Sequence, residues 1–275
     1  MSVSPRWTPP KVTGCAPLIH HWHLRKCAGT AIRDAMRMHR MQHPHYVEFH
    51  DSFAALVHGE RQQATVLRKR GASMPCGVRR IVVLREPYAQ FASEVAFFPS
   101  DFLRGSGDAS ALTYVDDHFV CSSKTMMGLC KRRGACNVSR VMEVLQGFDF
   151  VGWTNSMDTI FSVLRGWLSC GGRPNAEVTG RLETLAKVER SSLRSLSRDV
   201  ARGIPPNYTA RLEQQLRDRN ASVLTRRERL TFEALRRLPS RQTFEARNRC
   251  AMEVYRAALQ TYGPRGGPLP PRGCA

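Results

Sequence analysis

The chain has 275 residues and a formal net charge of +19, because 42 lysines and arginines outnumber 23 aspartates and glutamates. The length is sufficient for one large domain, and the charge favours polyanionic partners such as a nucleotide cofactor, an acidic polysaccharide or nucleic acid. No zinc-finger spacing, RNA-recognition motif or helix-turn-helix signature is found, and aromatic residues are not interleaved with the basic runs, so nucleic-acid recognition has no support beyond charge.

We expect a single α/β domain over residues 15–262, with a loose N-terminal segment (1–14) and a loose C-terminal tail (263–275). Residues 1–14 contain three prolines, and the tail is rich in proline and glycine. Between them, apolar runs that are typical of strands alternate with helical patterns. This alternation predicts a mostly parallel sheet with helices on both faces.

The first segment with suggestive chemistry is a turn between a predicted interior strand (16–24) and a predicted helix (30–41). Lys26 supplies a cation there, while Ala28 and Gly29 allow the backbone to approach an anion closely. Thr30 adds a hydroxyl and can cap the helix. The lysine precedes the glycine, so the nucleotide-triphosphate pattern G-x-x-x-x-G-K-[ST] is absent. The alternative is an ordinary turn with a solvated lysine.

The second segment begins with the strongest strand pattern in the chain, Arg79–Leu84, where four consecutive apolar residues include three that are β-branched. Arg85 follows the strand, and Pro87 suits the first turn of a helix. A helix that starts near Glu86 would carry Ser93 two turns on, so the guanidinium and the hydroxyl could bind one phosphate. Alternatively, Arg85 pairs with a neighbouring carboxylate and Ser93 is a surface residue.

Together the two segments resemble the carbohydrate sulfotransferases of the Golgi, in particular the heparan sulfate 2-O- and 6-O-sulfotransferases. The family's 5'-phosphosulfate loop reads approximately H-x-x-K-T-G-G-T, and this chain has His23, Lys26, Cys27, Ala28, Gly29 and Thr30 there. The family's 3'-phosphate segment reads approximately L-R-D-P-x-x-R-x-x-S-E/Y, and this chain has Leu84, Arg85, Glu86, Pro87, Gln90, Ser93 and Glu94. The departures from these patterns are at Cys27, Ala28, Glu86 and Gln90.

The resemblance implies a P-loop-like sulfotransferase fold and transfer of a sulfuryl group from 3'-phosphoadenosine-5'-phosphosulfate to a carbohydrate hydroxyl, without a metal. It implies that Lys26 holds the phosphosulfate and stabilises the leaving oxygen. Arg85 and Ser93 would hold the 3'-phosphate. The other residues implied in the phosphosulfate loop are Cys27, Ala28, Gly29, Thr30 and Ala31.

The acceptor proton needs a base, and His50 is our candidate. A short predicted strand, Tyr46–Phe49, ends at this histidine, and catalytic groups collect at strand ends of α/β sheets. Its position also matches the G-L-H-A-D-W segment of the 6-O-sulfotransferases, where the histidine is the base. Glu48 and His45 are reserves, and a structural histidine is the alternative.

Two further segments echo the family. Phe148–Leu164 is similar to its F-x-F-V-G-L-T-E segment, a strand leading into a helix, which Thr154 or Asn155 can cap. A last helical pattern runs to Tyr262 and stops at Gly263-Pro264. Both helices are expected to pack in the core.

The nine cysteines contain no C-x-x-C pair, so no structural zinc is predicted, and Cys27 is either a reactive thiol or a small filler. Three glycosylation sequons begin at Asn137, Asn207 and Asn220. The family's members are Golgi membrane proteins, although this chain contains no 18-residue apolar stretch and no signal-peptide core. We expect a location in the Golgi lumen.

Two other functions remain open. A non-catalytic basic module would bind heparin or nucleic acid with strong salt dependence and would ignore 3',5'-ADP. A kinase-like phosphoryl transferase would need magnesium and an acidic ligand after a strand, for which Glu86 is poorly suited. The expected partner is an anionic carbohydrate.

Overall fold

The computed structural model describes residues 17–24, 27–38, 41–42, 45–49, 62, 65, 77–104, 131–132, 135–169, 226–264 and 266. Its centre is a four-stranded sheet in the order β4-β1-β5-β8, in which every pair of neighbouring strands is parallel. These strands are β1 (Leu18–Trp22), β4 (Tyr46–Phe49), β5 (Val78–Leu84) and β8 (Phe150–Trp153). The predicted α/β class with a parallel sheet is confirmed.

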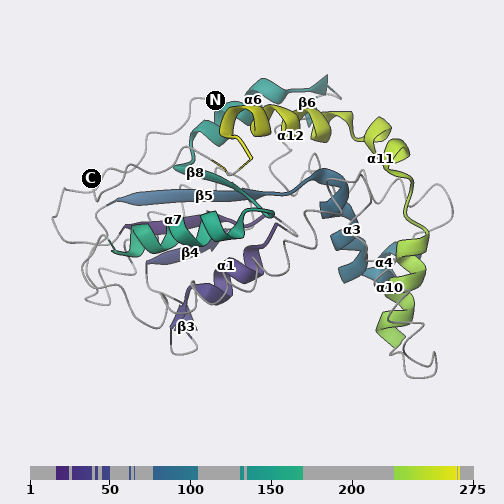
Figure 1. The fold of residues 1–275 in the computed structure, drawn as a ribbon, viewed down its shortest axis with the longest axis horizontal. Helices are drawn as coiled ribbons and strands as arrows, with labels where there is room; N and C mark the ends of the chain where they lie inside the picture. The colour runs from purple at the N-terminus through teal and green to yellow at the C-terminus, as the bar shows by residue number, and fades with distance from the viewer. Residues whose placement is uncertain are drawn as a thin grey trace.

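Helices cover both faces of this sheet (Figure 1). On one face, alternate strand residues such as Ile19, Ile81 and Phe150 form a core with α1 (Gly29–Ala35) and α7 (Met157–Ser169). On the other face, Trp22 and Val82 form a second core with α6 (Val138–Gln146) and α12 (Arg249–Tyr262). Successive side chains of a strand point to opposite faces, so continuous apolar runs are what a sheet covered on both sides requires.

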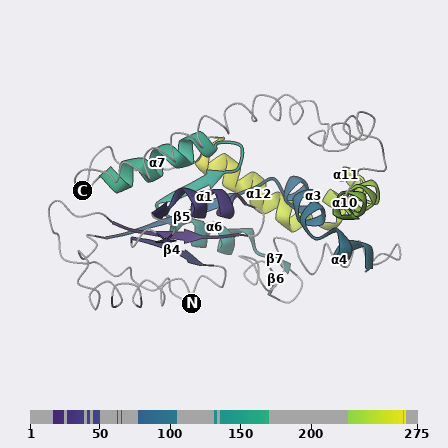
Figure 2. The ribbon, with the colours of Figure 1, turned by 90° about the horizontal axis from the view of Figure 1, so that it is seen from below.

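A second group of helices lies to one side of the sheet, where β5 leads into α3 (Figures 1 and 2). It comprises α3 (Pro87–Phe97), α4 (Pro99–Arg104), α10 (Arg226–Arg236) and α11 (Arg241–Arg247). Phe91 of α3 is fully buried at its centre, stacked on Phe244 of α11 at 5.2 Å and edge-on to Phe102 of α4 at 6.2 Å between ring centroids. The C-terminal helices are therefore packed against the helix that follows β5.

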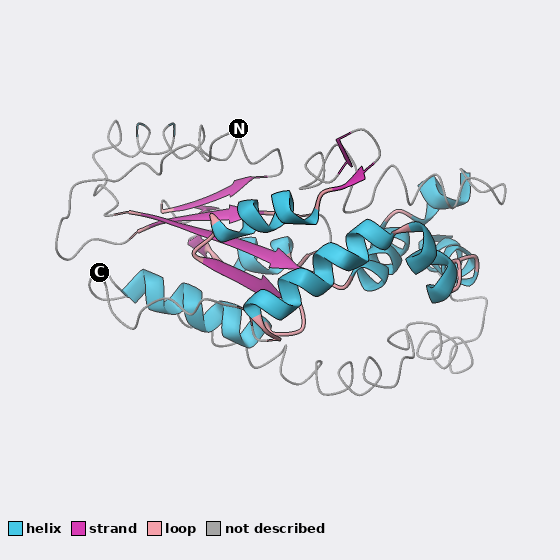
Figure 3. Cartoon of the chain, turned by 90° about the horizontal axis from the view of Figure 1, so that it is seen from above, coloured by secondary structure: helices cyan, strands magenta, loops and turns pink. Residues whose placement is uncertain are grey.

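Two short antiparallel pairs complete the described structure, β2 (Arg37–Met38) with β3 (Met41–Gln42) and β6 (Lys131–Arg132) with β7 (Ala135–Cys136). The first pair corrects the helix predicted over residues 30–41, because α1 ends at Ala35 and β2 follows directly. Met38, one of the apolar residues whose spacing suggested a longer helix, belongs to the hairpin. Figure 3 shows the β6–β7 pair apart from the main sheet.

The chain leaves α12 at Gly263, whose φ of 71° is accessible to glycine at little cost. Trp153 Nε1 donates to the Gly263 carbonyl at 2.6 Å, and Ser156 Oγ donates to the Pro264 carbonyl at 3.0 Å. These contacts hold the first residues of the segment 263–275, for which the sequence predicts loose structure. Within the described part of the chain, no helix combines the length and the apolar character needed to span a membrane.

Candidate functional site

The strand order defines one position in the sheet where a ligand site is expected. From β1 the chain reaches β4 on one side, whereas β5 lies on the other side of β1 and leads on to β8. The loops after β1 and β5 therefore diverge, and ligands of open α/β sheets bind in the crevice at such a point, outside the carboxyl ends of the strands. Trp22, the last residue of β1, is opposite Val82, so β5 extends only two residues further, to Leu84.

The two segments singled out in the sequence meet at this edge through Cys27 and Arg85. The Cys27 side chain is buried, and the backbone N–H of Arg85 hydrogen-bonds to it. The Arg85 guanidinium is close enough to act electrostatically on the thiol, as is Glu94 of α3. The loop after β1 and the start of the segment after β5 are thus in direct contact, although 58 positions separate Cys27 from Arg85 in the chain.

Cys27 is a structural side chain rather than a reactive thiol. Burial raises its pKa from 9.0 to about 12, and the neighbouring Arg85 offsets only part of that shift. Its backbone N–H also donates to the Leu24 carbonyl, at 3.2 Å. Of the two readings of this cysteine, the structure therefore supports the small filler, whose thiol is enclosed between the two segments.

The raised pKa has two measurable consequences. We expect Cys27 to resist iodoacetamide at pH 8 in the folded protein and to be alkylated once urea unfolds it, which mass spectrometry of the peptide would measure. Because unfolding restores the ordinary thiol pKa, the stability that this group contributes is present below pH 9 and is lost as the pH rises from 9 towards 12. Rapid alkylation of the folded chain would contradict this placement.

The turn into α1 contains a strained residue. Ala28 is the N-cap of the helix with a φ of 63°, the one non-glycine residue with positive φ in the described part of the chain. Its carbonyl accepts from Ile32 N–H at 3.2 Å, and no side chain caps the helix. The suggestion that Thr30 caps this helix is therefore wrong, since Thr30 is the second helical residue. The family pattern has glycine where this chain has Ala28.

Replacing Ala28 by glycine is expected to stabilise the protein. The left-handed conformation costs a non-glycine residue about 1–2 kcal/mol, and the greater freedom of glycine in the unfolded chain offsets roughly 0.4–1 kcal/mol of that gain. We expect a net gain of about 0.5–1 kcal/mol in urea denaturation. Ala257→Gly in α12, at a helical position, is the matched control and should lose about 1 kcal/mol. A loss in both variants would contradict the strain at Ala28.

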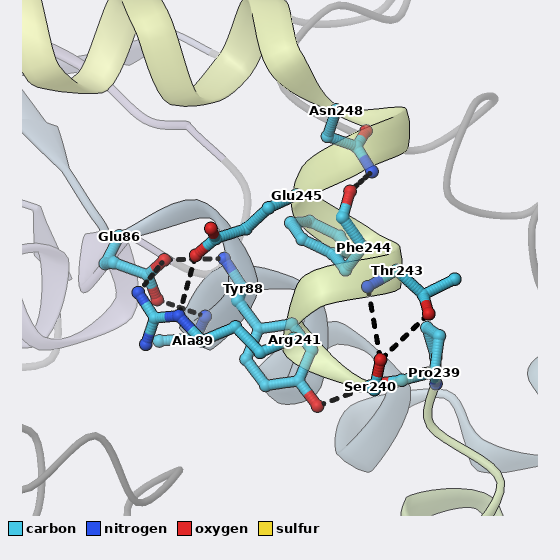
Figure 4. Close-up of polar contacts among 10 residues, drawn as sticks. All are labelled: Glu86, Tyr88, Ala89, Pro239, Ser240, Arg241, Thr243, Phe244, Glu245 and Asn248. Carbon is cyan, nitrogen blue, oxygen red and sulfur yellow. Dashed lines mark hydrogen bonds and ion pairs between the residues drawn. The ribbon is translucent and has the colours of Figure 1, made fainter.

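The residues after β5 are fixed by α3 and α11 (Figure 4). Glu86 is the N-cap of α3, where its carboxylate accepts from Tyr88 N–H at 3.2 Å and Ala89 N–H at 2.8 Å. Arg241 of α11 reaches the same carboxylate at 3.3 Å and also binds Glu245 at 2.7 Å. The prediction that α3 begins beside Glu86, with Pro87 in its first turn, is confirmed.

Further contacts hold α11 on α3. Tyr88 Oη donates to the Pro239 carbonyl at 3.0 Å, next to Ser240, the N-cap of α11. Burial is the main cause that raises the pKa of Tyr88, so its hydroxyl remains a donor at neutral pH. Arg85 is consequently attached to a rigid strand on one side and to a capped, clamped helix on the other. Its backbone position is therefore set by β5, α3 and α11, which are far apart in the sequence.

A second polar cluster lies at the ends of β1 and β4, and the sequence alone did not reveal it. His23 Nδ1 lies within ion-pair distance of Glu48 Oε1, and Arg33 Nη1 of α1 is 3.9 Å from Glu48 Oε2. Beside them, His21 Nδ1 is 2.7 Å from Tyr46 Oη. The register pairs His21 with Glu48 and Trp22 with Phe49, which brings these side chains together. Only the pairing of β1 with β4 could have indicated this.

The predicted site residues therefore fall into three groups. Lys26 and His50 lie outside the described residues, as does the side chain of Thr30. Ser93 is half-buried two turns into α3, and the reserve base His45 is buried directly before β4. The predicted residues that the structure places at the edge of β1 and β5 are Cys27, Ala28, Gly29, Ala31 and Arg85.

Among the described residues, no group of three or more histidine, cysteine, aspartate or glutamate side chains is arranged to hold a metal ion. Comparison of the chain with family models, curated protein sequences and solved structures finds no match.

Proposed function

We propose that the chain is a sulfotransferase that moves the sulfuryl group of 3'-phosphoadenosine-5'-phosphosulfate to a hydroxyl of a carbohydrate. The observation that carries the proposal is the contact between Cys27 and Arg85 at the switch point of the sheet. Through this contact, a loop suited to bind one anion and an arginine suited to bind a second anion lie at the ends of adjacent strands. A ligand with negative charge at both ends fits such a pair of sites, and this donor has one on its 5' side and one on its 3' side.

The described residues on each side of this contact support the proposal. Arg85 is half-buried at the end of β5, and a guanidinium binds phosphate through paired hydrogen bonds. The neighbouring carboxylate Glu86 is engaged by the first turn of α3 and by Arg241 of α11. On the other side, the chain enters α1 through a left-handed turn at Ala28.

In the proposed reaction the bond between sulfur and the acceptor oxygen forms as the bond between sulfur and the phosphate oxygen breaks. The protein's contribution is in-line positioning and electrostatic stabilisation of the leaving oxygen, the latter by Lys26. Arg85 and Ser93 would bind the 3'-phosphate and so fix the donor's distance from the acceptor. For the acceptor proton the sequence points to His50, which follows β4 directly, and the described residues place a second histidine at the same edge.

The acceptor we propose is an anionic carbohydrate, because the chain carries a net charge of +19 and an extended polyanion interacts favourably with such a field. We also propose that the protein works in the Golgi lumen. Cys250 of α12 is disulfide-bonded, which is typical of secretory compartments.

The sequon at Asn137 offers a test of this compartment. The residue is exposed, and its Oδ1 caps α6 by accepting from Arg140 N–H at 2.9 Å. We expect a glycosidase-sensitive mobility shift in secretory expression that becomes smaller in Asn137→Asp, which retains the capping oxygen; the sequons at Asn207 and Asn220 are unchanged in this variant. A shift of the same size in wild type and variant would exclude a glycan at Asn137.

The experiment that tests the function is calorimetric titration of 3',5'-ADP into the protein in the presence of a chelator. We expect micromolar binding, about −8 kcal/mol, and weaker binding of 5'-AMP, which lacks the 3'-phosphate. Transfer of radiolabel from the sulfuryl donor to an acidic polysaccharide would then identify the acceptor class. A folded protein that ignores 3',5'-ADP but binds heparin with steep salt dependence would instead be the basic binding module.

A further inference from the structure

β8 is the outermost strand of the described sheet, and one of its edges faces away from β5. The order β4-β1-β5-β8 places no described strand on that side. Thr154, directly after β8, donates its N–H to the Leu84 carbonyl of β5 at 3.0 Å. Because the backbone groups of successive strand residues point to opposite sides, those of Trp153 and Val151 point to the outer edge.

The chain that leaves α12 crosses this edge from one face of the sheet to the other. We call its described residues, Gly263, Pro264 and Gly266, the strap. It begins on the face covered by α12, where Trp153 Nε1 donates to the Gly263 carbonyl at 2.6 Å. The strap then reaches the start of α7, which covers the opposite face, because Ser156 Oγ donates to the Pro264 carbonyl at 3.0 Å.

Gly266 lies directly against the backbone of β8. A Cβ on this residue would stand 2.5 Å from the Val151 carbonyl oxygen and 3.2 Å from the Cα of Gly152. It would also stand 3.0 Å from the ring of Phe150, whose side chain packs on the α7 face. The φ of Gly266 is 82°, and its N–H donates to the Gly263 carbonyl at 3.2 Å. Glycine is the residue that adopts this conformation without strain and permits so close an approach.

An uncovered outer edge on this strand would be able to pair with another chain. The sequence from Phe148 to Trp153, FDFVGW, is aromatic and apolar apart from one aspartate, and it contains no proline. Strands of such composition pair readily with a second strand when their edge N–H and C=O groups are unpaired. The Val151 carbonyl, against which Gly266 lies, is one of the outward groups that such pairing would use.

We propose that the strap guards the outer edge of β8 and prevents this strand from pairing with β8 of a second copy of the chain. The inference is independent of the proposed sulfuryl transfer. A second copy is the fitting partner, because two identical edges related by a two-fold axis can pair as antiparallel strands. Release of the strap would join the sheets of two copies into one. Two side-chain hydrogen bonds and one glycine contact hold the strap, so single substitutions can release it.

The test is sedimentation velocity of the full chain over a range of protein concentrations. Gly266→Val adds a side chain that overlaps the backbone of β8, and Ser156→Ala removes the hydrogen bond to Pro264. We expect wild type to sediment alike at every concentration, Gly266→Val to move towards twice the mass as concentration rises, and Ser156→Ala to move less. Gly77→Val is the matched control and should behave as wild type, because nothing lies within 4 Å of where its Cβ would stand.

Hydrogen exchange of the peptide that contains β8 locates the contact. The N–H groups of Val151 and Trp153 point to the outer edge, so association of Gly266→Val through β8 should slow exchange in this peptide about tenfold or more. Slower exchange confined to another region would overturn the proposal. A Gly266→Val protein that stays monomeric would overturn it too, and Ser156→Ala decides in the same way should Gly266→Val fail to fold. Pairing through β8 in wild type would show that the strap does not guard the edge.

Discussion

Arg85→Ala is expected to weaken binding of 3',5'-ADP by about 30- to 1000-fold. A guanidinium–phosphate pair makes two charge-assisted hydrogen bonds, and a hydrogen bond to a charged group contributes about 1.5–3 kcal/mol. Loss of about 2–4 kcal/mol corresponds to this range in Kd. The measurement is the titration proposed for the wild-type protein, repeated on the variant at the same salt concentration, because phosphate binding is salt-dependent.

Arg79→Ala is the matched control, because Arg79 lies near the start of β5 and Arg85 directly follows its end. Arg79 Nη1 is 3.4 Å from Asp149 Oδ1, far along β5 from the carboxyl edge. The variant removes the same charge from the chain, so it measures the contribution of net charge alone. We expect Kd to change by less than about twofold and stability to fall by about 1 kcal/mol or less. Equal losses of binding in both variants would show that the overall field, rather than a site at Arg85, attracts the nucleotide.

The strands of the sheet could be predicted because their sequence patterns are local. The apolar run before Arg85 became β5, and residues 46–49 became β4 with the predicted bounds. The switch point follows only from the order in which the strands pair, and that order depends on contacts between distant segments. Proximity of the two segments proposed to bind anions was therefore an expectation taken from a resemblance, until the pairing of β1 with β5 supplied a physical reason for it.

Other features of the site carry no local signal. Nothing in the sequence around Glu48 indicates that it faces His23, because that contact depends on the register of β1 with β4. The ion pair between Glu86 and Arg241 joins residues 155 positions apart. Such contacts are selected by the tertiary fold rather than by local propensity, and both determine how the candidate site is held.

Gly29→Ala is expected to destabilise the protein, although alanine is the better helix former. A Cβ at this position would overlap the His23 ring, so the ring must leave its place between Gly29, His21 and Glu48. Overpacking of this kind costs about 1–3 kcal/mol. We expect a loss of that size in urea denaturation.

The same substitution in α7 should have the opposite sign. No atom lies within 4 Å of where a Cβ would stand on Gly166, which is exposed and within the helix, so Gly166→Ala should gain about 0.5–1 kcal/mol. Because both variants lose the same conformational freedom in the unfolded chain, the gap between them reports the folded environment alone. A Gly29→Ala protein as stable as Gly166→Ala would mean that His23 does not rest on the loop.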